Sequence, residues 1–81
     1  MKTFTKITKL KLKDKFGKIE TYRIARVDTD DGASYNIYLE VGAQSYLKYS
    51  TTSLDELNCR YQSMLREAKE QGKRYQVCRI S

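Results

Sequence analysis

The chain has 81 residues, of which 40% are hydrophobic, and its 16 Lys and Arg against 10 Asp and Glu give a formal net charge of +6. This length predicts one domain, residues 1–81, with so small a core that self-association into a homodimer is one way to add stability. Histidine is absent, which removes the commonest group for acid–base catalysis near neutral pH. Neither a long apolar run nor a secretory signal is visible, so we expect a cytoplasmic protein that does not enter a membrane.

The positive charge is concentrated near the N-terminus. Residues 1–18 hold seven lysines and a single acidic residue, Asp14, so this segment accounts for the whole net charge and the remainder of the chain is balanced. Because clustered positive charge attracts polyanions, this placement favours a partner with a negative surface, either nucleic acid or an acidic protein.

Residues 3–13 are predicted to form the first strand. Leu10 and Leu12 alternate with lysines, as in a strand that buries only one of its faces. Ile7 is out of phase with Leu10, so we expect either a bulge near Thr8 or a strand that begins there. The lysines between the leucines then face away from the core.

A hairpin connection and a second strand follow. Asp14 to Gly17 has the composition of a tight turn, and Gly17 is the residue that takes a positive φ at little cost. Residues 18–28 are predicted to form the second strand, with Tyr22 and Ile24 facing the core.

The third and fourth strands are bounded by turn clusters at residues 28–32 and 42–44. The strand between these turns has the cleanest alternation in the chain, with apolar residues on one side and polar residues on the other. Its predicted inward side chains are Tyr35, Ile37, Leu39 and Val41, and Tyr38 faces outward. In the fourth strand we expect Leu47 and Tyr49 to face inward and Tyr46, Lys48 and Ser50 to face outward.

A helix is predicted after the fourth strand. Ser53 to Glu56 has the Ser-x-x-Glu spacing of a capping box, so the helix should begin at Leu54. Gly72 is its natural stop, and residues 74–80 are predicted to return as a short strand along a sheet edge. The apolar positions recur at helical spacing and are Leu54, Leu57, Tyr61, Met64, Leu65 and Ala68.

Together these elements predict an α+β fold in the order ββββαβ. It consists of a four-stranded antiparallel β-meander, one amphipathic helix packed on one face of the sheet, and a short C-terminal strand. The helix covers the face that carries the apolar residues, which leaves the opposite face of the sheet exposed to solvent.

No set of catalytic or metal-binding residues is visible. The acidic turn at residues 28–32 lacks the Glu that a calcium loop needs at its twelfth position, where Leu39 stands. Cys59 and Cys78 have no CxxC partner, and we expect both to be plain reduced thiols. The sequence therefore predicts a protein that is not an enzyme and that uses no metal and no cofactor.

The outward face of the sheet is the predicted binding surface. It combines basic side chains, which follow a phosphate backbone, with tyrosines, which stack on unpaired bases. The expected contact residues are Lys9, Lys11, Lys13, Arg23, Tyr38, Tyr46 and Lys48. Lysines on an exposed strand also discourage edge-to-edge aggregation, which is the alternative explanation of the same pattern.

Two functions follow from such a surface. The first is a small basic module that binds nucleic acid, with single strands or RNA preferred over sequence-specific duplex DNA, because the outer side of the helix carries mixed charge and makes a poor major-groove reader. The alternative is a protein–protein interaction module, such as an inhibitor from a phage or mobile element that occludes a host enzyme acting on nucleic acid.

Overall fold

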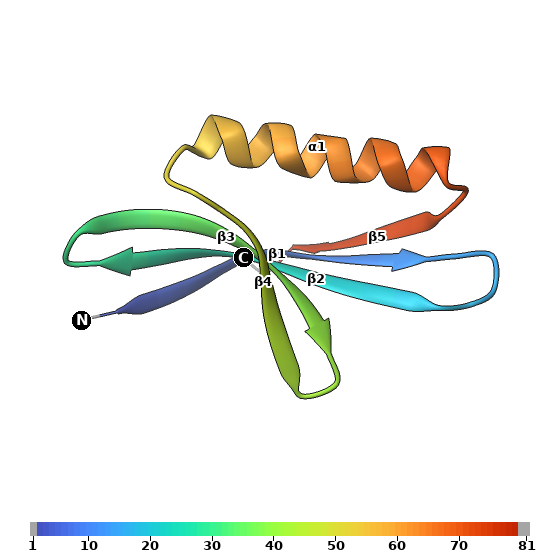
Figure 1. Ribbon diagram of the computed structural model, residues 1–81, viewed down its shortest axis with the longest axis horizontal. Coiled ribbons are helices and arrows are strands. Elements are labelled where there is room, and N and C mark those ends of the chain that lie inside the picture. Colours follow the sequence, from blue (N-terminus) through green and yellow to red (C-terminus); the bar gives the residue numbers. More distant parts are fainter. Residues whose placement is uncertain (1, 80–81) are drawn as a thin grey trace.

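The computed structural model describes residues 2–79, and the side chains as far as residue 77, as a five-stranded sheet with one helix lying across it (Figure 1). The elements in chain order are β1 (Thr3–Lys13), β2 (Ile19–Thr29), β3 (Gly32–Val41), β4 (Gln44–Thr51), α1 (Leu54–Glu70) and β5 (Arg74–Arg79). All strand pairs are antiparallel, in the order β4-β3-β2-β1-β5. The predicted α+β meander is confirmed, and the short last strand pairs with β1.

The β1–β2 hairpin is closed by the first residue of its turn. Asp14 Oδ1 accepts hydrogen bonds from the backbone N–H groups of Phe16 and Lys18, each at 2.9 Å, and the Asp14 N–H donates to the Lys18 carbonyl at 3.0 Å. Gly17 has a φ of 85°, which residues with a Cβ adopt only with strain. The predicted turn is therefore confirmed, and it fixes the register of the first two strands.

One irregularity in β1 explains the change of phase in its sequence. Lys6 and Thr8 pair with consecutive residues of β2, so Ile7 is an extra residue, and of the two expected alternatives the structure has the bulge. A bulge shifts the in-and-out alternation by one position. As a result Lys6 lies on the same face of the sheet as Lys9, although the two are an odd number of residues apart.

The helix begins where the sequence predicts, but its N-terminal cap differs in one contact. Ser53 Oγ accepts a hydrogen bond from the Glu56 N–H at 3.3 Å, as in a capping box. The Glu56 carboxylate does not return to Ser53. It accepts a 2.7 Å hydrogen bond from the Thr51 hydroxyl, and Thr51 Oγ1 accepts one from the Ser53 N–H at 3.1 Å. The box is thus closed through Thr51.

The helix ends in a Schellman motif. Gly72 has a φ of 72°, its N–H donates to the Lys69 carbonyl at 3.1 Å, and the Lys73 N–H donates to the Ala68 carbonyl at 2.8 Å. The predicted stop at Gly72 is confirmed. This turn brings Lys73 against β2, where its ammonium lies 3.1 Å from Glu20 Oε1.

The core lies between α1 and the face of the sheet that it covers, here called the helix face. Leu10, Ile24 and Ile37 are its most completely buried side chains, between 0% and 2% exposed. Partly buried residues pack around them: Tyr22, Tyr35, Tyr49, Tyr61, Met64 and Leu65. The predicted inward residues of β1 and β2 are confirmed, and so is the apolar stripe of α1 apart from Leu54, which is 50% exposed.

The alternation predicted for β4 is wrong in its first half. Consecutive residues of β3 pair with Tyr49 and Leu47, so Lys48 is an extra residue and forms a second bulge. Leu47 therefore shares a face with Tyr38 and is 57% exposed, whereas Tyr46 lies on the helix face. We predicted Leu47 in the core and Tyr46 facing outward, and the inserted residue reverses both because strand alternation has a period of two.

Candidate nucleic-acid interface

The face of the sheet opposite α1, here called the open face, carries a high density of positive charge. Residues that pair across antiparallel strands lie on the same side of a sheet, so the register assigns each side chain to a face. Among the described strand residues, the charged side chains of the open face are Lys6, Lys9, Lys11, Lys13, Arg23, Arg74 and Glu40. A negatively charged ligand therefore meets six cations and one carboxylate.

A row of residues from four strands crosses the middle of the open face. Lys9 pairs with Arg23, Arg23 with Tyr38, and Tyr38 with Leu47. The Arg23 guanidinium carbon lies 5.1 Å from the centre of the Tyr38 ring, within the range of a cation–π contact. The Tyr38 hydroxyl also accepts a 2.8 Å hydrogen bond from Asn36 Nδ2. These contacts hold the Tyr38 ring in one orientation on the sheet.

Glu40 neutralises part of the charge in this row. Its Oε2 lies 3.7 Å from Lys9 Nζ, and its Oε1 lies 3.8 Å from Arg23 Nε. Both distances exceed a hydrogen bond, and Arg23 Nε has no hydrogen-bond partner within the described part of the chain. Partly exposed ion pairs of this kind contribute about 0–1 kcal/mol. Glu40 therefore lowers the local charge but is only weakly held by its partners.

The other lysines of β1 are unpaired. Lys6, Lys11 and Lys13 are exposed, and none of them forms an ion pair with another residue between 2 and 79. Because strand residues rise by ~3.3 Å each, alternate lysines of β1 stand ~6.6 Å apart along the strand. Arg74 on β5 pairs with Lys13 and widens the row at the sheet edge. Regularly spaced, unpaired cations on a rigid strand suit a chain of phosphates.

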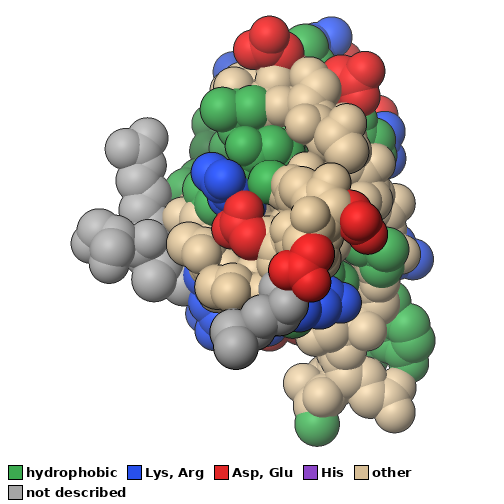
Figure 2. All heavy atoms as spheres, turned by 90° about the vertical axis from the view of Figure 1, so that its left-hand side faces the viewer, with side chains coloured by type: hydrophobic (Ala, Val, Ile, Leu, Met, Phe, Trp, Pro, Cys, Tyr) green, Lys and Arg blue, Asp and Glu red, His purple; other side chains and the backbone are tan. Residues whose placement is uncertain are grey.

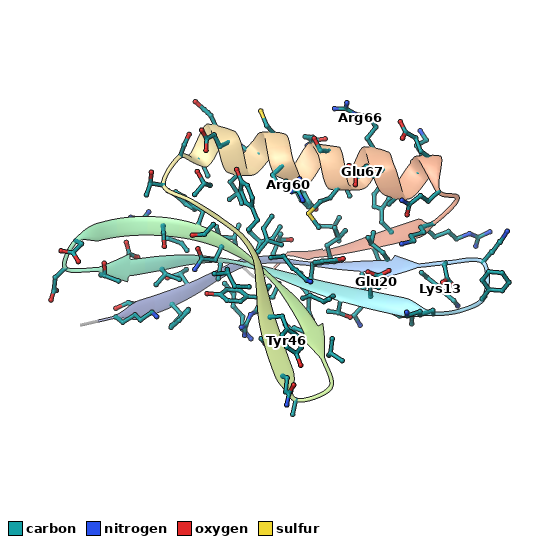
Figure 3. The ribbon with its side chains drawn as sticks, in the orientation of Figure 1. Lys13, Glu20, Tyr46, Arg60, Arg66 and Glu67 are labelled. Carbon is teal, nitrogen blue, oxygen red and sulfur yellow. The ribbon has the colours of Figure 1, made fainter. Side chains whose placement is uncertain are left out.

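The open face brings together five of the seven residues predicted for binding, namely Lys9, Lys11, Lys13, Arg23 and Tyr38. The other two lie elsewhere. Tyr46 is on the helix face, and Lys48 lines a groove beside α1. Figure 3 shows Lys13 and Tyr46 on hairpins that diverge from each other. The prediction that Tyr46 and Lys48 share one surface with the lysines is wrong, and the cause is the bulge in β4.

The open face also holds residues that the predicted alternation did not include. Lys6 joins it through the bulge at Ile7, and Phe4, which is 54% exposed, lies two residues further along. Arg74 joins it because β5 pairs with β1. Lys6 could have been found by counting back in steps of two from the expected bulge. Arg74 could not, because alternation within a strand says nothing about strand order.

Many carboxylates lie at one end of the molecule instead. Asp28 lies near the end of β2, Asp30 and Asp31 form the β2–β3 connection, and Asp55 and Glu56 belong to the first turn of α1. These segments sit at the same end in Figure 1, and Figure 2 views that end, where acidic side chains are spread over the surface. Among the described strand residues, Glu40 is the one carboxylate on the same face of the sheet as the lysine row of β1.

An ionisable cluster on the helix face involves Glu20, Tyr22 and Lys73. Lys73 Nζ donates to Glu20 Oε1 at 3.1 Å, and the Tyr22 hydroxyl donates to Glu20 Oε2 at 2.9 Å. The hydrogen bond from Lys73 lowers the pKa of Glu20 most, and the hydrogen bond from Tyr22 lowers it further. Burial is the larger cause and the hydrogen bond to Glu20 the smaller one that together raise the pKa of Tyr22 to about 12. A carboxylate held ionised and a phenol held neutral make a structural link rather than an acid–base pair near neutral pH.

The remaining candidate groups are isolated. Cys59 is an exposed free thiol, and the side chain of Cys78 lies outside the described residues. Among the side chains that the structure describes, no three Cys, Asp or Glu gather as the ligands of a metal ion. The 17-residue helix α1 is too short and too polar to cross a bilayer, and that range holds no other helix.

Comparison with known proteins gives no match. No family model fits the chain, and searches among curated proteins and among solved structures find nothing similar.

Proposed function

We propose that the protein binds single-stranded nucleic acid or RNA through the open face of its sheet. The observation that supports this most strongly is the row of unpaired lysines on β1, on a face where the described strands place one carboxylate. Each lysine that neutralises a phosphate releases condensed counterions, which is the main source of affinity in sequence-independent binding.

The aromatic residues of the open face suit unpaired bases. Tyr38 is held in one orientation by its contacts with Arg23 and Asn36, so stacking a base against this region loses little side-chain entropy. Base stacking on an aromatic ring is worth about 1–3 kcal/mol and is tolerant of sequence. The combination of a lysine row and a fixed aromatic residue favours a flexible single strand over a stacked duplex.

The helix is poorly placed to read duplex DNA. Its apolar stripe is occupied by the core, and its outer side mixes Arg66 and Lys69 with Glu70. A recognition helix needs an exposed side that enters the major groove without bringing carboxylates to the phosphates. The sheet is therefore the better surface for a negatively charged partner.

The test compares two charge-matched double variants. Lys11→Gln with Lys13→Gln removes two unpaired cations from β1, and Arg66→Gln with Lys69→Gln removes two from the outer side of α1, where Figure 3 shows Arg66 pointing away from the sheet. Binding to a labelled oligothymidine is followed by fluorescence anisotropy between about 50 and 200 mM salt. We expect the β1 variant to lose affinity and to reduce the slope of log K against log salt by about 1.4, and the α1 variant to match the unaltered protein.

Four further outcomes decide the proposal. Replacing Lys11 and Lys13 by Arg should retain binding, because the charge is kept. A duplex of the same length should bind less tightly than the single strand. Equal loss in both double variants would contradict an interface on the open face, and equally effective competition by polyglutamate would indicate an acidic protein partner instead of nucleic acid.

A further inference from the structure

A groove runs along the helix face between α1 and the strands beside it. It has a volume of about 380 Å³, which lies in the range of small-molecule sites. Its floor is apolar and includes Leu12, Ile37 and Ala68, which are between 1% and 6% exposed, together with Met64. This groove is on the other side of the sheet from the lysine row and plays no part in the function proposed above.

The groove exists because β4 and its hairpin leave the helix. Tyr49 packs with the core residues beneath α1. The residue before it, Lys48, is the bulge that reverses which side chains of β4 point toward the helix face. Beyond it the β3–β4 hairpin points away from α1 in Figure 1. The sheet therefore covers only part of the side of α1 that carries Arg60, Met64 and Glu67.

One end of the groove is cationic. Lys48 comes from β4 and Arg60 from α1, so they approach it from two different walls, and Figure 3 shows Arg60 on the side of the helix that faces the sheet. The Arg60 guanidinium carbon lies 5.5 Å from the centre of the Tyr49 ring. Neither Lys48 nor Arg60 forms an ion pair among the described residues. These cations stand beside an apolar floor without a carboxylate to neutralise them.

At the other end of the groove the cation is already paired. Lys73 is bonded to Glu20, which also accepts the hydrogen bond from Tyr22. Glu67 lies two turns along the helix from Arg60, a rise of ~10 Å. An anion is therefore attracted to the Lys48 and Arg60 end and is repelled from the Glu67 end, which gives an elongated ligand one preferred direction.

We propose that this groove binds a small amphipathic carboxylate that is free in solution. Its carboxylate lies between Lys48 and Arg60, and its hydrocarbon body lies along Met64, Ala68 and Leu12 toward Glu67. Arginine matches a carboxylate with two parallel donors, and the Tyr49 ring beneath it limits the orientations of the guanidinium. The apolar body replaces water over Met64, which the sheet and helix leave partly exposed.

Octanoate and 1-octanol form a matched pair of probes, because they share a chain length and only octanoate carries a charge. Each is titrated into the ¹⁵N-labelled protein and followed by two-dimensional NMR. We expect octanoate to shift the amide signals of Ile37, Met64 and Ala68, and to bind about tenfold more tightly than octanol. Shifts confined to β1 and β5, equal affinity for the two probes, or no saturable shifts would overturn the proposal.

Variants then locate the charge. Lys48→Gln with Arg60→Gln should lower the affinity for octanoate about tenfold and leave the affinity for octanol unchanged, since the floor is intact. Arg66→Gln, on the outer side of α1, is the control and should change neither. Unchanged amide spectra without probe would show that the variants remain folded, and an octanoate affinity that survives the double substitution would contradict the assigned head-group site.

Discussion

The two faces of the sheet are built from the same strands and differ in how firmly their side chains are held. On the helix face, Leu10, Ile24 and Ile37 are enclosed by α1. On the open face, Lys11 and Lys13 have no described partner. The difference shows that one face fixes the fold and leaves the other free to carry charge, as long as its residues keep the strand alternation.

The open face is not uniform along the strands. Ala25 and Val27 lie on it by register and yet are only 2% and 3% exposed. Their partners on β1 are Lys6 and Phe4, on the N-terminal side of the bulge at Ile7. On the N-terminal side of the bulge the open face thus contains two buried apolar residues of β2, whereas the β1 residues of that face beyond the bulge are basic and at least partly exposed.

The largest expected effect is a difference between the two faces in how much their side chains contribute to the free energy of unfolding. Ile37→Ala removes a side chain that is 1% exposed and should lower the free energy of unfolding by about 2–5 kcal/mol. Leu47→Ala, on the open face, should change it by less than about 0.5 kcal/mol. Urea denaturation of both variants measures the difference. A comparable loss for Leu47→Ala would mean that the open face is buried in solution, as in a homodimer.

The next effect concerns the cap that places α1 over the helix face. Ser53→Ala should cost about 1 kcal/mol, because the Glu56 N–H loses its acceptor. Thr51→Val breaks the link between Glu56 and Ser53, so its effect should be smaller when Ser53 is already Ala than when it is Ser. Thermal unfolding of the two single variants and the double variant tests this coupling. Thr52→Val, at an exposed neighbouring position, is the control and should be nearly neutral.

A smaller effect is expected on the affinity of the open face. Glu40→Gln removes the carboxylate beside Lys9 and Arg23, and should raise the affinity for oligothymidine about two- to five-fold at low salt. Stability should change by less than about 1 kcal/mol. Anisotropy titrations of the variant measure the gain. Unchanged or weaker binding would place the contact with the oligonucleotide away from this row.

The smallest effects are changes in titration on the helix face. Tyrosinate absorbance should show one of the seven tyrosines ionising late, since the pKa of Tyr22 is raised to about 12. Tyr22→Phe should remove that step. Glu20→Gln should move it to lower pH, because the carboxylate that holds the phenol proton is gone. A late step that persists in the Phe variant would belong to another tyrosine.

The pKa shifts of Glu20 and Tyr22 also predict the pH ranges in which the stability of the protein changes. The pKa of Glu20 is lowered in the folded protein, so its contribution is present above its ordinary value of 4.5 and is lost as pH falls through the folded-state pKa. The pKa of Tyr22 is raised, so its contribution is present below pH 10 and is lost as pH rises toward 12. Glu20→Gln should weaken the first dependence, as measured by urea unfolding at a series of acidic pH values.

Local signals were enough to predict much of the fold. The turn at Asp14, the bulge in β1 and the two ends of α1 depend on residues close in sequence, and each was predicted from them. In β4 the local signal is ambiguous. Tyr46 and Tyr49 can each face core or water, so either phase of the strand is acceptable and the bulge at Lys48 leaves no mark in the sequence.

The residues of the candidate site likewise fall into those that the local sequence predicts and those that it does not. Lys9, Lys11 and Lys13 follow from alternation within one strand, and Arg23 and Tyr38 follow from the same rule in β2 and β3. The placement of Arg74 depends on which strand β5 joins, and the groove beside α1 depends on how far the β3–β4 hairpin turns from the helix. Both are consequences of long-range packing that no short segment encodes.

The pairing of β5 with β1 has a consequence for the order in which the chain folds. During synthesis β1 is made before β5, so one of its edges stays unpaired until Arg74–Arg79 have emerged. An open strand edge invites pairing with other chains, and lysines along it oppose that by mutual repulsion. The charge that suits β1 to a polyanion therefore also protects the nascent protein while its sheet is incomplete.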